Sequence, residues 1–168
     1  MFQCLSRLFG ESRTPSNHLL GIPEGGLPPS GTEVDKMIKY PYSENSQKKL
    51  EQCDPRLIEI FEEVACHINT TVITGHRDKE TQNEMYRTGK SQLQWPDSKH
   101  NTLPSTAIDS APYPIDWNDR ERATLFAGFV LGVASSFGVT LRWGGDWDQD
   151  WQVNDNHFDD LWHFEIKE

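Results

Sequence analysis

Cysteine is scarce in this chain. Among its 168 residues only Cys4, Cys53 and Cys66 are cysteines, an odd number in which no two have C-x-x-C spacing. Disulfide-built domains and cysteine-based zinc sites need more cysteines at closer spacing. We therefore expect free thiols in a protein made in a reducing compartment. A thiol nucleophile is disfavoured as well, because Cys66 and His67 are neighbours on an expected helix and their side chains diverge.

Positive charge is also in short supply. The chain has 16 Lys and Arg against 26 Asp and Glu, a formal net charge of -10, and no basic stripe. Proteins that bind nucleic acid use clustered basic side chains to displace counterions, so nucleic acid is excluded as a partner. Bulk charge cannot draw the chain to an anionic surface either, and any such recognition must be local and specific.

Long hydrophobic runs are absent too. The first ten residues are interrupted by Gln3, Ser6 and Arg7, which leaves no apolar core of a signal peptide. No later run approaches the length of a membrane-spanning helix, so stable membrane insertion is not expected. These absences predict a cytoplasmic location with no visible route out of it.

The composition divides the chain into two parts. Residues 1–42 are rich in glycine and proline and have few apolar residues after Leu20, which predicts a flexible N-terminal arm or linker. Residues 43–168 are long enough for one domain with a real hydrophobic core.

Periodicity within the second part predicts an α+β fold. Apolar residues three and four apart indicate a helix that Asp54 caps, and a second, longer helix over 120–137 that Gly138 ends. Shorter helices are expected over 46–52 and 78–86. Strands are expected over 70–74, 107–111, 139–143 and 162–166. We expect helices on one face of a small, mainly antiparallel sheet.

Two stretches carry the candidate chemistry. A period of two places Asp109 on the face opposite Ile108, and places His163 and Glu165 on the face opposite Phe164. With His100 in the loop before the first of these strands, two imidazoles and a carboxylate make the usual protein ligand set of a catalytic zinc site. The alternative is that each is an ordinary surface or hydrogen-bonded residue, since the spacing alone is not specific.

Several motifs in these stretches resemble those of one enzyme family. Ser98-x-His100, Ala107-x-Asp109 and Asp160-x-x-His163-Phe164-Glu165 are similar to the motifs of the LAS metallopeptidases, and the closest likeness is to phage L-alanyl-D-glutamate endolysins of the M15 type. The likeness runs from about Ser43 to Glu168. It also includes Gly75-His76-Arg77, Gly89-Lys90-Ser91, Gln94-Trp95-Pro96, the run from Ala111 to Trp117, and Arg142-Trp143-Gly144-Gly145-Asp146-Trp147.

The resemblance implies roles for individual residues. It implies zinc on His100, Asp109 and His163, with Asp160 as the catalytic acid and base and Arg77 beside the scissile carbonyl. Without the resemblance, Arg77 would be read as an exposed ion pair with Asp78 or Glu80. We expect Glu165 to orient His163, because both lie on one face of the strand.

The chain departs from the family pattern in two places. The interval from His100 to Asp109, which contains Thr102-Leu103-Pro104-Ser105, is longer than the commonest form. Trp162 stands where related endolysins often have proline. The first departure affects the geometry of the loop, and the second affects the turn at Asp160.

The resemblance implies a fold like that of hedgehog and the D,D-peptidases, and a zinc-dependent peptidase that cleaves the L-Ala-D-Glu bond of the peptidoglycan stem peptide for bacterial cell lysis. Such a protein would act as a monomer and wait in the host cytoplasm before lysis. Two alternatives remain open: a D-alanyl-D-alanine carboxypeptidase and a non-catalytic zinc-containing binding module. A serine hydrolase is disfavoured, because the chain has no Gly-x-Ser-x-Gly elbow.

A second cation is one of two interpretations of a short acidic stretch. Asp146, Asp148 and Asp150 alternate as in the first half of a calcium loop, but Trp151 replaces the usual glycine and the bidentate Glu is missing. The stretch is interpreted either as a Ca²⁺ site or as a solvated acidic turn.

Overall fold

The computed structural model describes residues 40–168. The predicted arm or linker, residues 1–42, lies outside the described residues except for its last three positions, and the boundary at residue 43 stays a prediction. Two of these positions, Tyr40 and Tyr42, are hydrogen-bonded to the domain. The Tyr40 amide donates to the Ala65 carbonyl at 2.8 Å, and the Tyr42 hydroxyl donates to the Phe61 carbonyl at 2.7 Å.

Four strands form one antiparallel sheet in the order β1-β2-β4-β3. Their bounds are β1 Thr70–Thr74, β2 Ala107–Pro112, β3 Leu141–Gly144 and β4 Asp160–Ile166. All four predicted strands are present, and the expectation of a mainly antiparallel sheet is confirmed. The two central strands, β2 and β4, are the ones that carry Asp109 and His163.

Helices begin where the sequence supplies a capping side chain. The helices are α2 Glu44–Leu50, α3 Pro55–His67, α4 Lys79–Arg87 and α5 Arg120–Ser136, with a 3₁₀ turn, η1, at Lys99–Asn101. Asp54, Asp78 and Asp119 each accept a main-chain N–H in the first turn of α3, α4 and α5. Gly138, which has a φ of +72°, follows the end of α5. Within residues 40–168 no helix is long and apolar enough to cross a bilayer.

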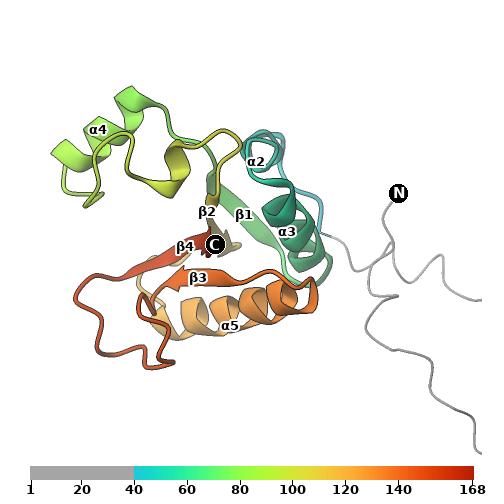
Figure 1. The fold of residues 1–168 in the computed structure, drawn as a ribbon. Helices are drawn as coiled ribbons and strands as arrows, with labels where there is room; N and C mark the ends of the chain where they lie inside the picture. The colour runs from blue at the N-terminus through green and yellow to red at the C-terminus, as the bar shows by residue number, and fades with distance from the viewer. Residues whose placement is uncertain (1–39) are drawn as a thin grey trace, which may run out of the picture.

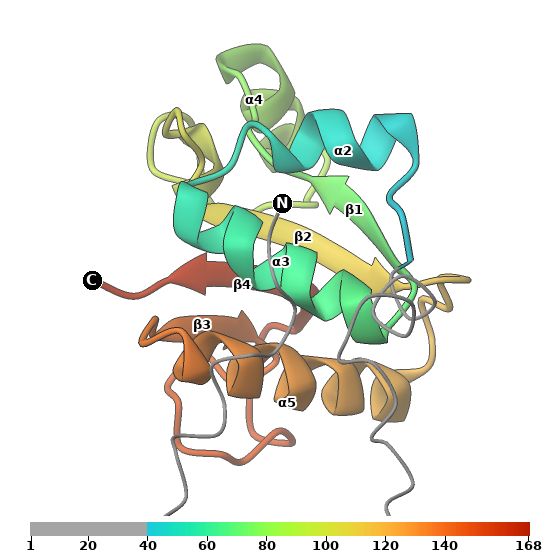
Figure 2. The same cartoon turned by 90° about the vertical axis from the view of Figure 1, so that its right-hand side faces the viewer.

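Helices α3 and α5 cover one face of the sheet (Figure 1; Figure 2). The core lies between them and the strands, where Ile108 of β2 and Phe164 of β4 are fully buried. The α+β architecture with helices on one face is therefore confirmed. On α5 the buried line runs through alanines as well as Phe126 and Val130, because small side chains let the helix lie close to the sheet.

The two described cysteines differ. Cys66 is disulfide-bonded, so the expectation of a free thiol is wrong at that position. Cys53 is a free thiol and is 2% exposed. Burial, and then the negative charge of Asp109, raise the pKa of Cys53 to about 12. This thiol stays protonated at neutral pH, which agrees with the exclusion of a thiol nucleophile.

The core predicts a large effect of one truncation. Phe61 is fully buried and meets Phe164 edge to face at 5.7 Å. Phe61→Ala is expected to lower the free energy of unfolding by about 3–5 kcal/mol through lost burial and a cavity. Leu125→Ala, at a residue 78% exposed, is the control and is expected to change it by less than about 0.5 kcal/mol. Urea unfolding measures both, and equal midpoints for the two variants would contradict this description of the core.

Candidate active site

The pairing of β2 with β4 sets one side of the site. Asp109 and His163 are directly opposite in the antiparallel register. Their side chains meet on the face away from α3 and α5, with His163 Nδ1 3.0 Å from Asp109 Oδ1. The predicted alternation is confirmed here, because their neighbours Ile108 and Phe164 point into the core.

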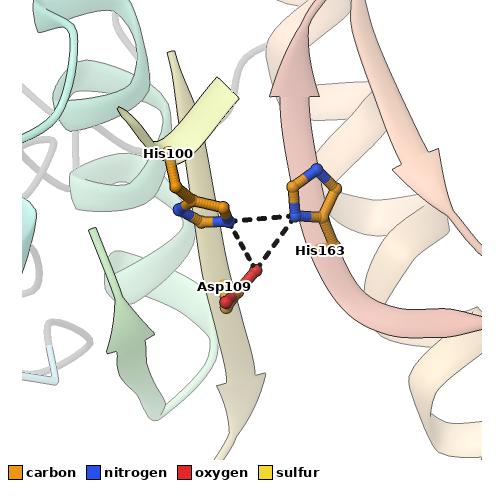
Figure 3. Close-up of side chains that lie close together, drawn as sticks. All are labelled: His100, Asp109 and His163. Carbon is orange, nitrogen blue, oxygen red and sulfur yellow. Dashed lines mark hydrogen bonds and ion pairs between the residues drawn. The ribbon is translucent and has the colours of Figure 1, made fainter. Parts of the chain in front are cut away.

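His100 joins this pair from the η1 turn. Its Nε2 lies 3.0 Å from Asp109 Oδ1 and 3.1 Å from His163 Nδ1. Figure 3 shows the three side chains converging from β2, β4 and the turn between β1 and β2. His100 is 1% exposed, and Ser98 and Asn101 cap its turn reciprocally. The structure thus brings together the three residues proposed from sequence as metal ligands.

Hydrogen bonds on the outer side of each ring determine which nitrogen faces inward. His100 Nδ1 is 2.7 Å from the Gly75 carbonyl oxygen, to which it can only donate. His163 Nε2 is 3.1 Å from Glu165 Oε2 in the same way. In the neutral rings His100 Nε2 and His163 Nδ1 are therefore lone-pair acceptors. With Asp109 Oδ1 they make three acceptor atoms within 3.1 Å of one another, an arrangement that requires a cation or a proton between them.

The pKa directions agree with this requirement. Burial acts to raise the pKa of Asp109, but the adjacent His100 and then His163 hold it well below its usual range. Burial likewise acts to lower the pKa of His163, but hydrogen bonds with Asp109 and Glu165 raise it to about 9. Without a metal, a proton on His163 therefore balances the Asp109 carboxylate at neutral pH.

Asp160, the first residue of β4, lies beside this group. Burial, and then the negative charge of Asp109, raise the pKa of Asp160, while the positive charges of His163 and Arg77 act against this rise. The backbone of Asp160 packs closely against Gly144. A Cβ at position 144 would lie 2.3 Å from the Asp160 carbonyl oxygen, so a larger residue there would displace Asp160. A partly buried carboxyl with a raised pKa suits general acid–base chemistry.

Arg77 follows β1 and reaches the same site. Its Nη2 donates to Asp109 Oδ2 at 2.6 Å, and the residue is 7% exposed. The ion pair is therefore with Asp109, not with Asp78 or Glu80. Within residues 40–168, Arg77 Nε is the only buried side-chain nitrogen or oxygen without a hydrogen-bond partner.

The long interval between His100 and Asp109 is accommodated at the surface. Leu103 is 73% exposed, so the extra residues project into solvent. The chain then returns to the domain at Ser105, whose amide donates to the Gln52 carbonyl at 2.8 Å. Trp162, the second departure from the family pattern, is 6% exposed and meets Trp117 edge to face at 6.3 Å.

Two partners in the site were not anticipated. The Gly75 carbonyl fixes His100, and Arg142 donates from Nε to Glu165 Oε1 at 3.0 Å. Main-chain carbonyls have no residue-type signal in a sequence. Arg142 did have one, because it alternates with the buried Leu141 and Trp143, but its use needs the Arg142–Glu165 register.

The acidic stretch is a hydrogen-bonded turn. Ligand oxygens of Asp146, Asp148 and Asp150 lie within 4.8 Å of one another. Asp146 also accepts the main-chain N–H groups of Asp150 at 3.1 Å and Trp151 at 3.2 Å. Calcium at this turn stays a prediction.

Two comparisons with known proteins find matches to this chain. Residues 38–166 match the family model described as phage L-alanyl-D-glutamate peptidase. Comparison with curated proteins finds no match. Among solved structures, the chain is similar to the Serratia marcescens L-Ala D-Glu endopeptidase ChiX, with 24% identity and a TM-score of 0.57 over 77% of this chain and 92% of that one. The family match spans the whole sheet and every residue of the site, and the chain belongs to the phage L-alanyl-D-glutamate peptidase family.

Proposed function

We propose that this peptidase is zinc-dependent and hydrolyses the L-Ala-D-Glu bond of peptidoglycan stem peptides during lysis of a bacterial host. The observation that carries the zinc proposal is the cluster of three inward-facing acceptors, His100 Nε2, Asp109 Oδ1 and His163 Nδ1. The description of the family as L-alanyl-D-glutamate peptidases and the L-Ala D-Glu specificity named for the Serratia marcescens enzyme support the choice of bond.

The three acceptors fit zinc by type and by spacing. Two imidazoles and one carboxylate are a common ligand set of catalytic zinc, which keeps one position open. Ligand atoms at tetrahedral zinc lie about 3.4 Å apart, and the separations of 3.0–3.1 Å here need only a small expansion. When bound, zinc supplies Lewis acidity toward the scissile carbonyl and lowers the pKa of water.

Asp160 is proposed as the group that moves protons. In its ionised form the carboxylate takes a proton from the attacking water, and it then gives that proton to the leaving amine of D-Glu. Its burial near Asp109 raises its pKa, which brings the group closer to the range in which both steps are efficient near neutral pH.

Arg77 is proposed to stabilise the negative charge that develops on the scissile carbonyl oxygen, or to hold a substrate carboxylate. Its Nη2 is engaged by Asp109, which fixes the guanidinium beside the three acceptors. Its Nε has no partner among the described residues and remains available as a donor.

The first test is removal of the proton-moving carboxyl. Asp160→Asn is expected to reduce hydrolysis of purified peptidoglycan by about 10²–10⁴-fold, because the amide cannot accept the proton of water. Mass spectrometry of the products measures both rate and bond: L-Ala-D-Glu cleavage leaves glycan-linked L-Ala and a peptide that begins with D-Glu. Glu44→Gln, at an exposed side chain of α2, is the control.

Other products would change the conclusion. Release of free D-Ala by the unaltered chain would replace the proposed activity with that of a D-alanyl-D-alanine carboxypeptidase. Retained zinc without any hydrolysis would identify a binding module. Full activity of Asp160→Asn would remove Asp160 from the mechanism.

The second test uses the raised pKa of His163. Because hydrogen bonds with Asp109 and Glu165 raise this pKa to about 9, the imidazole is protonated at neutral pH and must lose that proton to bind zinc. Zinc binding is therefore expected to release about one proton, and its apparent affinity should rise about tenfold per pH unit below pH 9. Calorimetry in buffers of different ionisation enthalpy measures the release.

A matched variant isolates the cause. Glu165→Gln removes the negative partner of His163 Nε2, so it should lower the pKa of His163 and decrease the number of protons released at neutral pH. Zinc affinity that does not change with pH would contradict the assignment of His163 as a ligand.

A further inference from the structure

The motif Arg142-Trp143-Gly144-Gly145-Asp146-Trp147 supplies no proposed metal ligand or proton-transfer group, but it forms a tight turn next to the site. Trp143 is buried in the core and donates from Nε1 to the Leu161 carbonyl at 2.8 Å. A Cβ at Gly145 would lie 2.3 Å from the Trp143 ring, so this position requires glycine. The Asp146 amide donates back to the Trp143 carbonyl at 3.1 Å. The chain therefore reverses, and Trp147 comes to lie over the sheet.

This reversal closes a ring of four side chains. His163 Nε2 pairs with Glu165 at 3.1 Å, and Glu165 accepts two hydrogen bonds from the Arg142 guanidinium. The Arg142 guanidinium lies 5.3 Å from the centre of the Trp147 ring. The Trp147 ring lies 5.5 Å from the His163 ring at an interplanar angle of 34°. Each member of the ring thus contacts the next, and the last contacts the first.

From this geometry we propose that Trp147 and Arg142 are positioning residues that hold the His163 imidazole with Nδ1 toward His100 and Asp109. The inference rests on the proposed role of His163 as a metal ligand. Glu165 alone fixes one edge of the imidazole. Trp147 packs against the ring and opposes its rotation about the Cβ–Cγ bond, and Arg142 holds Glu165 in place.

Trp147 is itself firmly anchored. Its Nε1 donates to the Phe158 carbonyl at 2.8 Å, and its ring stacks on that of Phe158 at 6.5 Å. Its amide donates to Asn156 Oδ1 at 3.3 Å. These contacts come from the far end of the loop between β3 and β4, so Asn156 and Phe158 help to hold Trp147 against His163.

Zinc affinity is the main readout, because it does not require activity. Loss of a partner that orients a metal-binding imidazole typically reduces affinity about 10–100-fold. Trp147→Leu and Arg142→Gln are each expected to lose that much in competition titrations with a chromophoric zinc chelator. Trp147→Phe keeps an aromatic ring in contact with His163 and Arg142, so its zinc affinity should remain within about threefold of that of the unaltered chain.

A control in the same loop tests whether the effect comes from the location of Trp147 beside His163 or from the loss of any tryptophan in the loop. Trp151 is 82% exposed, so Trp151→Leu makes the same chemical change away from His163 and should leave zinc affinity unaltered. Affinity within twofold of the unaltered chain for both Trp147→Leu and Arg142→Gln would overturn the inference.

A crystal structure tests the positioning role in the absence of metal. Crystal structures of the metal-free Trp147→Leu chain are expected to show the His163 ring rotated, with Nδ1 no longer in hydrogen-bond range of Asp109. An unmoved ring would overturn the inference. If the unaltered chain binds zinc but hydrolyses nothing, the proposed function fails while these two measurements still test the positioning role.

Discussion

The pairing of the two central strands is the constraint on which the site depends. Asp109 of β2 and His163 of β4 stand opposite each other in the antiparallel register. A slip of either strand by one residue would turn its polar side chain, Asp109 or His163, into the core and would bring its apolar neighbour, Ile108 or Phe164, out to solvent. Since Ile108 and Phe164 are fully buried beneath α3 and α5, hydrophobic burial on one face holds the polar geometry on the other.

Charge balance is the second organising feature. The site alternates in sign, from Arg77 to Asp109 and then to His163, Glu165 and Arg142. Each buried carboxylate has a positive partner, so its desolvation is offset locally even though the whole chain is strongly acidic. A divalent ion between His100, Asp109 and His163 would replace the proton that His163 otherwise retains.

Much of this could be predicted from the sequence, because strands and helix starts have strong local signals. Alternation placed Asp109 and His163 on their correct faces, and capping residues such as Asp54 marked helix starts. Long-range contacts had no such signal. The hydrogen bond from His100 to the Gly75 carbonyl and the contact of the Trp147 ring with the His163 ring depend on how distant segments meet. Patterns along the chain specify the face of a strand or helix on which a side chain lies, but they do not specify the distant backbone atom to which it will hydrogen-bond.

The loop that carries Trp147 is also attached to the helical layer. Arg120, the first residue of α5, binds the Asp159 carboxylate and the Val153 carbonyl. These contacts fix the loop immediately before Asp160, so the start of a helix on the opposite side of the sheet helps to define where that carboxyl lies. If the β3–β4 loop is replaced by a different one, the first turn of α5 must be changed with it so that the contacts of Arg120 with the loop are preserved. The two segments form one transplantable unit, although they are more than thirty residues apart in the chain.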